Sequence, residues 1–163
     1  MILLQPTNNN TINIALTGKM RSGKDTVAKQ LIKAFEDDNN TRVVMFGFGD
    51  ALKEYAQELF PNKFANGQKP RYLYQWFGQT MRIQDEDIWV RMAADNINHS
   101  KSFSSLFKNV INVITDLRQP NEYQFCKDNN FIIVKVECDD AVRLERMKAI
   151  NDKFDITDLT HET

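Results

Sequence analysis

The chain is poor in the residues that build metal centres, disulfide frameworks and nucleic-acid surfaces. Its 163 residues include only 2 cysteines and 2 histidines, and the cysteines form no CxxC pair and have no histidine at metal-ligand spacing. The formal net charge is -1, from 21 Lys and Arg against 22 Asp and Glu, so the basic excess of a general nucleic-acid binder is missing. These absences argue against a disulfide-rich domain, a zinc site and a nucleic-acid partner. Cysteines that are not arranged as a disulfide framework fit a reducing, cytoplasmic compartment.

Long apolar runs are also absent. No stretch of about 18 uncharged apolar residues occurs, and no basic segment followed by a long apolar core opens the chain. This predicts a soluble protein with no membrane partner. Neither histidine has partners at catalytic spacing and no GxSxG pentapeptide occurs, so we expect no hydrolase triad. Hydrophobic residues at 42% and charged residues at 26% are ordinary globular values, and we expect a single domain over residues 1–163.

The apolar pattern alternates between the period of strands and the period of helices. It predicts strands at 12–17, 42–48, 110–114 and 131–136, and helices at 25–37, 50–60, 71–97 with a break near Asp85, 120–127 and 141–150. Asp50 is the expected N-cap of its helix, and residues 61–70 and 100–105 are expected to be loops. Alternating strands and helices indicate an α/β fold in which a mostly parallel sheet carries helices on both faces.

The strongest functional signal is a glycine-bearing turn between the first predicted strand and the first predicted helix. Residues 18–24 read Gly-Lys-Met-Arg-Ser-Gly-Lys, which matches the GxxxxGK motif in the context that the motif requires. The glycines let the backbone wrap a phosphate, the helix N-terminus adds partial positive charge, and Lys24 reaches the β- and γ-phosphates. The motif predicts a P-loop that binds a nucleotide through Gly18, Lys19, Arg21, Ser22, Gly23, Lys24, Asp25 and Thr26.

The residue after the motif lysine departs from the common pattern. Ser or Thr there normally ligates Mg²⁺, whereas this chain has Asp25 followed by Thr26. The Asp25 carboxylate is a hard oxygen ligand that could hold the ion. It is equally an acid that the dipole of a helix start favours, and both interpretations stay open here. We expect Lys24 to lie at an exposed helix start, so that its replacement by Ala reduces activity and barely changes the melting temperature.

Three further segments stand out beside residues 18–26: Phe48-Gly-Asp-Ala-Leu-Lys53, the stretch from Lys69-Pro-Arg71 through Tyr74-Gln-Trp-Phe-Gly-Gln79 to Arg82, and Ile114-Thr-Asp116-Leu-Arg118-Gln-Pro-Asn121-Glu122. In these segments the chain resembles the deoxynucleoside monophosphate kinases of bacteriophages and their bacterial relatives. The resemblance covers residues 12 to about 150. Animal-type phosphomevalonate kinases look like distant relatives that share the Ser-Gly-Lys-Asp turn, and they are the runner-up.

The resemblance implies a three-layer P-loop NTPase fold of the nucleoside monophosphate kinase type. It implies a core at 12–60 and 106–150, an acceptor-binding insertion at about 61–105 and a basic lid at about 141–155. It implies ATP as phosphate donor, Mg²⁺ held by Asp25 and Asp116, and catalytic cations at Lys24, Arg118, Arg143 and Arg146. Acceptor contacts are expected from Asp50, Lys53, Arg71, Gln75, Trp76, Gln79 and Arg82. Such kinases usually carry a fifth core strand after the lid, and no further apolar strand pattern precedes Thr163.

The side chains expected around the acceptor have a second interpretation. Arg71 and Arg82 are eleven residues apart, about three helical turns, so both can project from one face and grip a monophosphate. Tyr74, Trp76 and Phe77 between them could form a base pocket. Aromatic residues at helical spacing more often pack in a core, so we favour packing for the aromatics and the site for the arginines.

Asp116 and the two arginines near the C-terminus also allow two interpretations. Asp116 ends the third predicted strand, where it would either orient Mg²⁺ as a Walker-B-like acid or cap a loop by bonding to Asn121 or Glu122. Arg143 and Arg146 are three residues apart and therefore share a helix face. That face belongs either to a lid over the phosphates or to a solvated helix.

Two hypotheses for the function result from these patterns. The first is a Mg²⁺-dependent kinase that moves the γ-phosphate of ATP to a deoxynucleoside monophosphate, whose own phosphate is already an anionic nucleophile. The second is a nucleotide-binding regulator that kept the P-loop without turnover. Arg71 and Arg82, placed for an acceptor, favour the kinase. We expect small-molecule nucleotide substrates as partners, with a homodimer as one candidate assembly.

Overall fold

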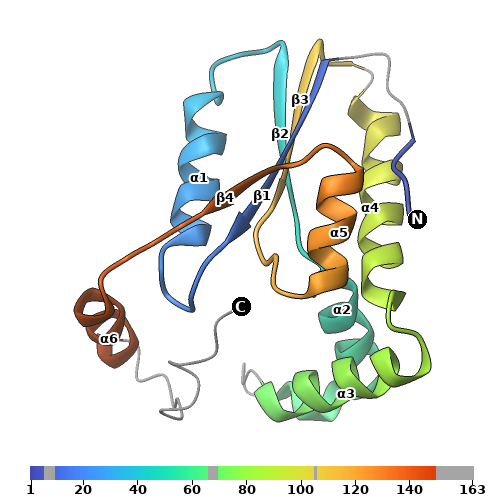
Figure 1. The fold of residues 1–163 in the computed structure, drawn as a ribbon, viewed down its shortest axis with the longest axis vertical. Coiled ribbons are helices and arrows are strands. Elements are labelled where there is room, and N and C mark those ends of the chain that lie inside the picture. Colours follow the sequence, from blue (N-terminus) through green and yellow to red (C-terminus); the bar gives the residue numbers. More distant parts are fainter. Residues whose placement is uncertain (6–9, 66–69, 105, 150–163) are drawn as a thin grey trace.

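The computed structural model describes residues 1–5, 10–65, 70–104 and 106–149, whose arrangement is shown in Figure 1. In chain order the elements are β1 (Asn10–Thr17), α1 (Lys24–Ala34), β2 (Thr41–Phe46), α2 (Asp50–Leu59), the short 3₁₀ helix η1 (Pro61–Lys63), α3 (Arg71–Gln84), α4 (Ile88–Ser104), β3 (Asn109–Ile114), α5 (Pro120–Asp128), β4 (Ile132–Lys135) and α6 (Asp140–Ala149). No helix in these ranges is long and apolar enough to cross a membrane.

The four strands form one parallel sheet in the order β2-β3-β1-β4. Alternate side chains of each strand point to opposite faces, so Leu16 of β1 packs with Ala28 of α1, whereas its neighbour Ala15 packs with α4 and α5. Figure 1 shows α1 on one side of the sheet and α4 and α5 on the other. The predicted three-layer α/β fold with a parallel sheet is confirmed.

This strand order determines where a ligand can bind. Strands β1 and β3 are neighbours, and the segments that follow them lead to helices on opposite faces of the sheet. A crevice therefore opens outside their carboxyl ends, which is the usual ligand position in open parallel sheets. The predicted P-loop follows β1, and Thr115 and Asp116 follow β3, so both meet at this crevice.

Helices α2 and α3 build a second apolar cluster at that end of the sheet. Its buried members are Ala51, Leu52, Ala56, Phe77 and Trp89. A Cβ at Gly78 would lie 2.5 Å from Leu52 Cδ1, so the absence of a side chain there permits the close contact of α3 with α2. The expectation that Phe77 packs in a core is confirmed.

Two local predictions were wrong. Residues 100–104 belong to α4 and are not a loop, and the Ser100 hydroxyl donates to the carbonyl of Ile97 at 2.8 Å within that helix. The hydroxyl is thus satisfied inside the helix, by a bond to a preceding carbonyl that a mid-helix serine commonly makes. Asp50 is the first residue of α2, whose N-cap is Gly49, because the Asp50 carboxylate pairs with Lys53 at 2.9 Å and makes no cap.

The predicted break near Asp85 is confirmed, because Asp85 has extended backbone angles between α3 and α4. Strand β2 ends at Phe46, two residues before the predicted end, because Gly47 begins the turn that leads into α2. Lys69, the predicted lid residues 150–155 and the region where a fifth strand was sought lie outside the described residues.

Candidate active site

A cavity of about 710 Å³ lies at the carboxyl ends of β1 and β3, and we call it the P-loop cavity. Its walls come from the P-loop with the start of α1, the turn between β2 and α2 with the start of α2, the helix α3, the turn between β3 and α5 with the start of α5, and α6. Among the residues with predicted roles, it is lined by Arg21, Gly23, Lys24, Asp25, Thr26, Lys53, Arg82, Asp116, Arg118 and Arg146. The fold thus gathers side chains from five separate segments around one space.

The P-loop owes its shape to three left-handed backbone positions. The φ angles are 141° at Gly18, 64° at Arg21 and 108° at Gly23. A Cβ at Gly18 would lie 2.3 Å from the carbonyl oxygen of Val136. The residue after β1 must therefore be a glycine, both because of its positive φ and because of this close contact. Gly23 is the N-cap of α1, and no side chain in the described part of the chain caps that helix, which leaves its start open to a phosphate.

Lys24 is 9% exposed, and its ammonium group donates to the carbonyl oxygens of Gly18 at 2.6 Å and Lys19 at 3.1 Å. Burial lowers the pKa of Lys24, and the nearby charge of Arg118 lowers it further. The expectation of an exposed helix start was wrong at this residue, because the side chain folds back into the loop and becomes part of its structure.

Asp116 accepts hydrogen bonds from the backbone N–H groups of Phe48 at 2.8 Å and Gly49 at 3.0 Å. Burial raises the pKa of Asp116, and these two bonds oppose that rise by stabilising the carboxylate. The predicted capping contact with Asn121 or Glu122 was wrong, since the carboxylate bonds to the turn between β2 and α2. It thereby ties the end of β3 to that turn.

Asp25 is exposed in the first turn of α1 and lines the P-loop cavity together with Asp116. Within the described part of the chain, no group of three or more His, Cys, Asp and Glu side chains is placed to hold a metal ion. Mg²⁺ commonly takes only one or two carboxylates and completes its shell with waters and substrate phosphates. Two carboxylates on a phosphate-binding cavity fit that ion. The helix-dipole interpretation of Asp25 also fits its position.

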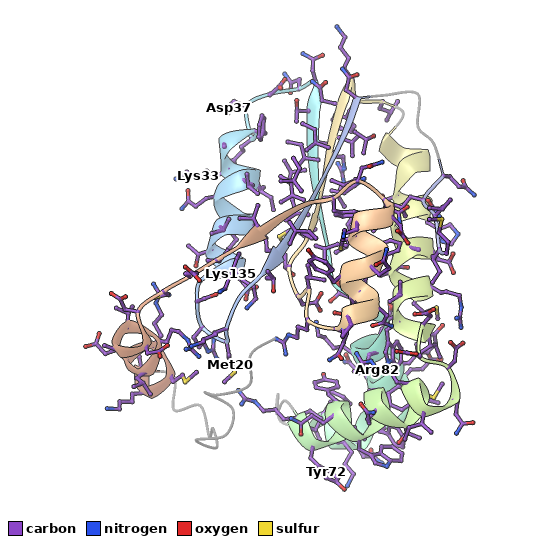
Figure 2. The ribbon with its side chains drawn as sticks, in the orientation of Figure 1. Met20, Lys33, Asp37, Tyr72, Arg82 and Lys135 are labelled. Carbon is purple, nitrogen blue, oxygen red and sulfur yellow. The ribbon has the colours of Figure 1, made fainter. Side chains whose placement is uncertain are left out.

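The acceptor side of the cavity is formed by α3 and the turn before α5. Arg82 is half-buried, and its guanidinium lies 3.7 Å from the Glu122 carboxylate. Figure 2 shows Arg82 on the side of α3 that faces the sheet and Tyr72 on the far side. Tyr74 also lines the cavity, and its ring centroid is 5.7 Å from that of Phe64.

The structure does not bring the other predicted acceptor residues to this cavity. Four of them have exposed side chains on α3 and do not belong to the described lining: Arg71, Gln75, Trp76 and Gln79. Asp50 does not belong to it either, but its carboxylate pairs with Lys53, which lines the cavity. The Trp76 ring packs on Phe60 with centroids 6.2 Å apart. Arg71 and Arg82 are separated by about 16 Å along the helix axis, and the described cavity lining extends back along α3 from Arg82 to Tyr74, three residues after Arg71. Acceptor contact by these residues stays a prediction.

Glu122 is a buried acid that sequence reasoning did not assign to the site. It is 3% exposed, and its Oε2 atom accepts the N–H groups of Arg118 at 2.8 Å and Gln119 at 2.9 Å. Burial raises the pKa of Glu122. Glu122 lies three residues after the N-cap Gln119, a spacing typical of a capping box, so this contact could have been predicted from the sequence. The contact with Arg82 joins two distant segments and has no sequence signature.

The two arginines of α6 both contact the P-loop. Arg143 is 2% exposed, donates from Nε to the carbonyl of Met20 at 2.9 Å and pairs with Asp140. Arg146 is exposed and donates to the carbonyl of Arg21 at 3.0 Å. The prediction that they share a helix face is confirmed, and the solvated-helix alternative is wrong for Arg143.

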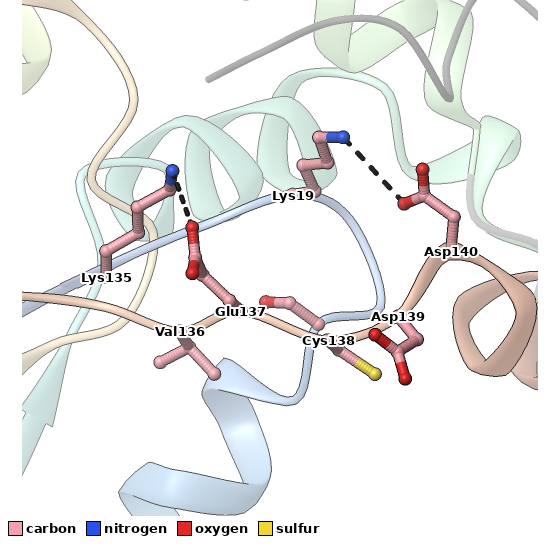
Figure 3. Close-up of a pocket in the computed structure, with 8 residues that line it drawn as sticks. Lys19, Lys135, Val136, Glu137, Cys138, Asp139 and Asp140 are labelled. Carbon is pink, nitrogen blue, oxygen red and sulfur yellow. Dashed lines mark ion pairs between the residues drawn. The ribbon is translucent and has the colours of Figure 1, made fainter.

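A second cavity, of about 590 Å³, lies between the P-loop and the segment 135–140, and Figure 3 shows it. Lys19 points across it toward Asp140 at 3.8 Å, and Lys135 pairs with Glu137 at 2.8 Å. Ser22 also lines this cavity and is 6% exposed. Of the predicted P-loop residues, Lys19 and Ser22 line this cavity, the five from Arg21 and Gly23 to Thr26 line the P-loop cavity, and Gly18 belongs to neither described lining.

Comparison with known proteins supports the fold. No curated protein matches the chain. The crystal structure of TT1252 from Thermus thermophilus is similar, with 21% sequence identity, a TM-score of 0.51 and coverage of 86% of this chain and 73% of that one. The crystal structure of APE1195 has 14% identity and a TM-score of 0.45 over 91% of this chain and 73% of that one. A family model for the AAA domain matches residues 14–157, and the chain therefore belongs to this family of P-loop NTPases, with a kinase-like nucleotide-binding domain.

Proposed function

We propose that the protein is a Mg²⁺-dependent kinase that transfers the γ-phosphate of ATP to a deoxynucleoside monophosphate. The observation that carries the proposal is that the cationic side chains lining one cavity come from different parts of the chain. Lys24, Arg82, Arg118 and Arg146 reach the P-loop cavity from four different segments. Aligning two phosphate-bearing substrates requires positive charge from several directions, because the enzyme mainly positions them and stabilises the transferring group.

The donor side of the proposed reaction is the P-loop. Its glycines and the uncapped start of α1 suit the β- and γ-phosphates of ATP, with Lys24 beside them. Asp25 and Asp116 would hold Mg²⁺, which neutralises phosphate charge when it is bound. Asp116 is suited to this role because Phe48 and Gly49 hold its carboxylate in one position.

The acceptor side is the part of the cavity formed by α3 and the turn before α5. There, Arg82 and Arg118 would bind the acceptor monophosphate, and Tyr74 would contact its base or sugar. An oxygen of the acceptor phosphate forms a bond to the γ-phosphorus, the bond from that phosphorus to the β-bridging oxygen breaks, and ADP leaves with the electron pair. No general base is required, since the attacking oxygen is already ionised at neutral pH.

The domain organisation belongs to the same proposal. We place the donor core at 12–60 and 106–150, the acceptor-binding insertion at about 61–105 and a lid at about 141–155. The contribution of Tyr74 and Arg82 of α3 to the cavity supports the insertion, and the contact of Arg146 with the P-loop supports a role for α6 beside the donor.

The test is a product assay. The purified protein is incubated with ATP and Mg²⁺ and, separately, dTMP, dGMP, dCMP and dAMP, and the diphosphate product is separated by ion exchange. We expect a deoxynucleoside diphosphate with at least one acceptor. If none forms while phosphomevalonate is phosphorylated, the runner-up replaces the proposal. ATP binding without turnover of any acceptor would identify a nucleotide-binding regulator.

A further inference from the structure

Four successive carbonyl groups of the P-loop each accept a hydrogen bond from a cationic side chain. Lys24 donates to the carbonyls of Gly18 and Lys19, at 2.6 Å and 3.1 Å. The next two carbonyls, of Met20 and Arg21, are bound by α6 at 2.9 Å and 3.0 Å. The first pair of bonds comes from the loop's own lysine, and the second pair comes from arginines more than 120 residues away in the chain.

The two arginine contacts lie on either side of a strained residue. Arg21 has a φ of 64°, a left-handed conformation that is unfavourable for an L-residue with a side chain. Its preceding peptide carries the Met20 carbonyl and its following peptide carries the Arg21 carbonyl. Since the C=O and N–H of a trans peptide point in opposite directions, holding both carbonyls toward α6 also sets the direction of the loop N–H groups. These N–H groups are the part of a P-loop that meets phosphate.

Arg143 is suited to hold the loop and is poorly placed to meet a phosphate. Its side chain is 2% exposed and lines neither cavity. One guanidinium nitrogen bonds to Met20 and another pairs with Asp140, while Nη2 is buried and has no partner among the residues that the structure describes. A buried guanidinium with an unpaired nitrogen opposes folding, and an apolar side chain would fill the same space without that penalty. Its favourable contacts are therefore the pair with Asp140 on its own helix and the bond to the loop, and only the second reaches the phosphate-binding turn.

We propose that Arg143 is a positioning residue of the phosphate-binding loop, which holds the peptide after Met20, and that Arg146 supports the next peptide from the same helix face. Figure 2 shows Met20 in the turn after β1, on the side of α6. This role replaces the predicted one of Arg143 as a catalytic cation on a closing lid. It rests on nucleotide binding at the P-loop, which is part of the proposed function, and is independent of the acceptor.

The experiment compares the parent with Arg143→Met, Arg143→Lys and Arg146→Met. Lys148→Met is the control, because Lys148 is an exposed cation on the same helix. Isothermal titration calorimetry measures the Kd for ATP with Mg²⁺. Hydrogen exchange, without nucleotide, follows the backbone amides of residues 19–23. Arg143→Met keeps an unbranched apolar side chain in the place of the arginine stem and removes the donors, and Arg143→Lys restores one donor, so the two variants together report the lost hydrogen bonds.

We expect Arg143→Met to weaken ATP binding about tenfold, equivalent to about 1.4 kcal/mol, and to accelerate exchange at residues 19–23 while β3 amides keep the parent rate. Arg143→Lys should recover part of both effects, because an ammonium group can donate one bond to Met20. A folded Arg143→Met protein with the parent's Kd and exchange rates would overturn the proposal. If both Arg143 variants fail to fold, Arg146→Met decides, since Arg146 is exposed, and unchanged exchange there overturns the proposal. If the parent protein binds no ATP, the proposed nucleotide site is refuted. The hydrogen-exchange rates of residues 19–23 in the parent and in Arg143→Met would still test whether Arg143 holds the loop.

Discussion

Replacing Lys24 with Ala tests whether the P-loop lysine serves both the reaction and the structure. The buried ammonium group makes two hydrogen bonds to loop carbonyls, at 2.6 Å and 3.1 Å. Each bond from a charged donor contributes about 1.5 to 3 kcal/mol. The burial that lowers the pKa of Lys24 opposes part of that gain. We therefore expect a net loss of about 2 kcal/mol in the free energy of unfolding, which for a domain of this size lowers Tm by about 4 to 8 °C.

The effect on turnover should be far larger than the effect on stability. Removing one group that stabilises transition-state charge commonly reduces kcat by about 10²- to 10³-fold, and we expect at least that loss with ATP and the preferred acceptor. Circular dichroism measures Tm, and a coupled assay for ADP measures kcat. Lys29→Ala is the control, because Lys29 is an exposed lysine on the same helix, and it should leave both quantities unchanged.

The two measurements refute different parts of the reasoning. A Lys24→Ala protein with the parent's Tm would show that the bonds to Gly18 and Lys19 do not stabilise the loop. A Lys24→Ala protein with the parent's kcat would remove the P-loop from the proposed mechanism. A loss of activity explained by unfolding alone is identified by assaying at a temperature where the variant is fully folded.

Three further outcomes are expected. Asp25→Ala should raise the Mg²⁺ concentration for half-maximal activity while Asp25→Ser keeps the parent value; an unchanged value in Asp25→Ala would leave only the helix-dipole role, of about 0.3 to 1 kcal/mol. Burial raises the pKa of the Cys126 thiol to about 12, so this thiol should not react in the folded protein. An aromatic disulfide reagent should therefore modify one thiol per native chain, at the half-exposed Cys138, and the second thiol only after unfolding. Rapid modification of the folded Cys138→Ser variant would contradict this. Burial also raises the pKa of Glu122 above its ordinary value of 4.5. Between the pKa of the unfolded chain and the higher pKa of the folded chain, the folded chain binds more protons, so the free energy of unfolding falls as pH rises through this range. Denaturant titrations at about pH 5 and about pH 7 should therefore show a smaller fall in Glu122→Gln than in the parent, and an equal fall would refute the assignment.

Local patterns predicted the P-loop and the order of helices and strands well. The spacing of glycines and Lys24 after an apolar strand requires only neighbouring residues, and the structure places the turn between β1 and α1 as expected. The errors arose where a polar side chain bonded to a partner that the local pattern did not indicate, within the same helix at Asp50 and in a distant turn at Asp116. Asp50 pairs with Lys53 and leaves the N-cap to Gly49, and Asp116 bonds to the turn before α2.

The sequence by itself determined the α/β alternation and the position of the phosphate-binding turn, because both depend on periodicity and on residues adjacent in the chain. Only the tertiary structure decided which cations face the cavity. It brings Arg82 to the cavity and leaves Arg71 outside the lining, and it buries Arg143 against Met20. These differences depend on how far α3 extends from the crevice and on which face of α6 packs against the P-loop. Residues distant in sequence set both, through packing that no local pattern records.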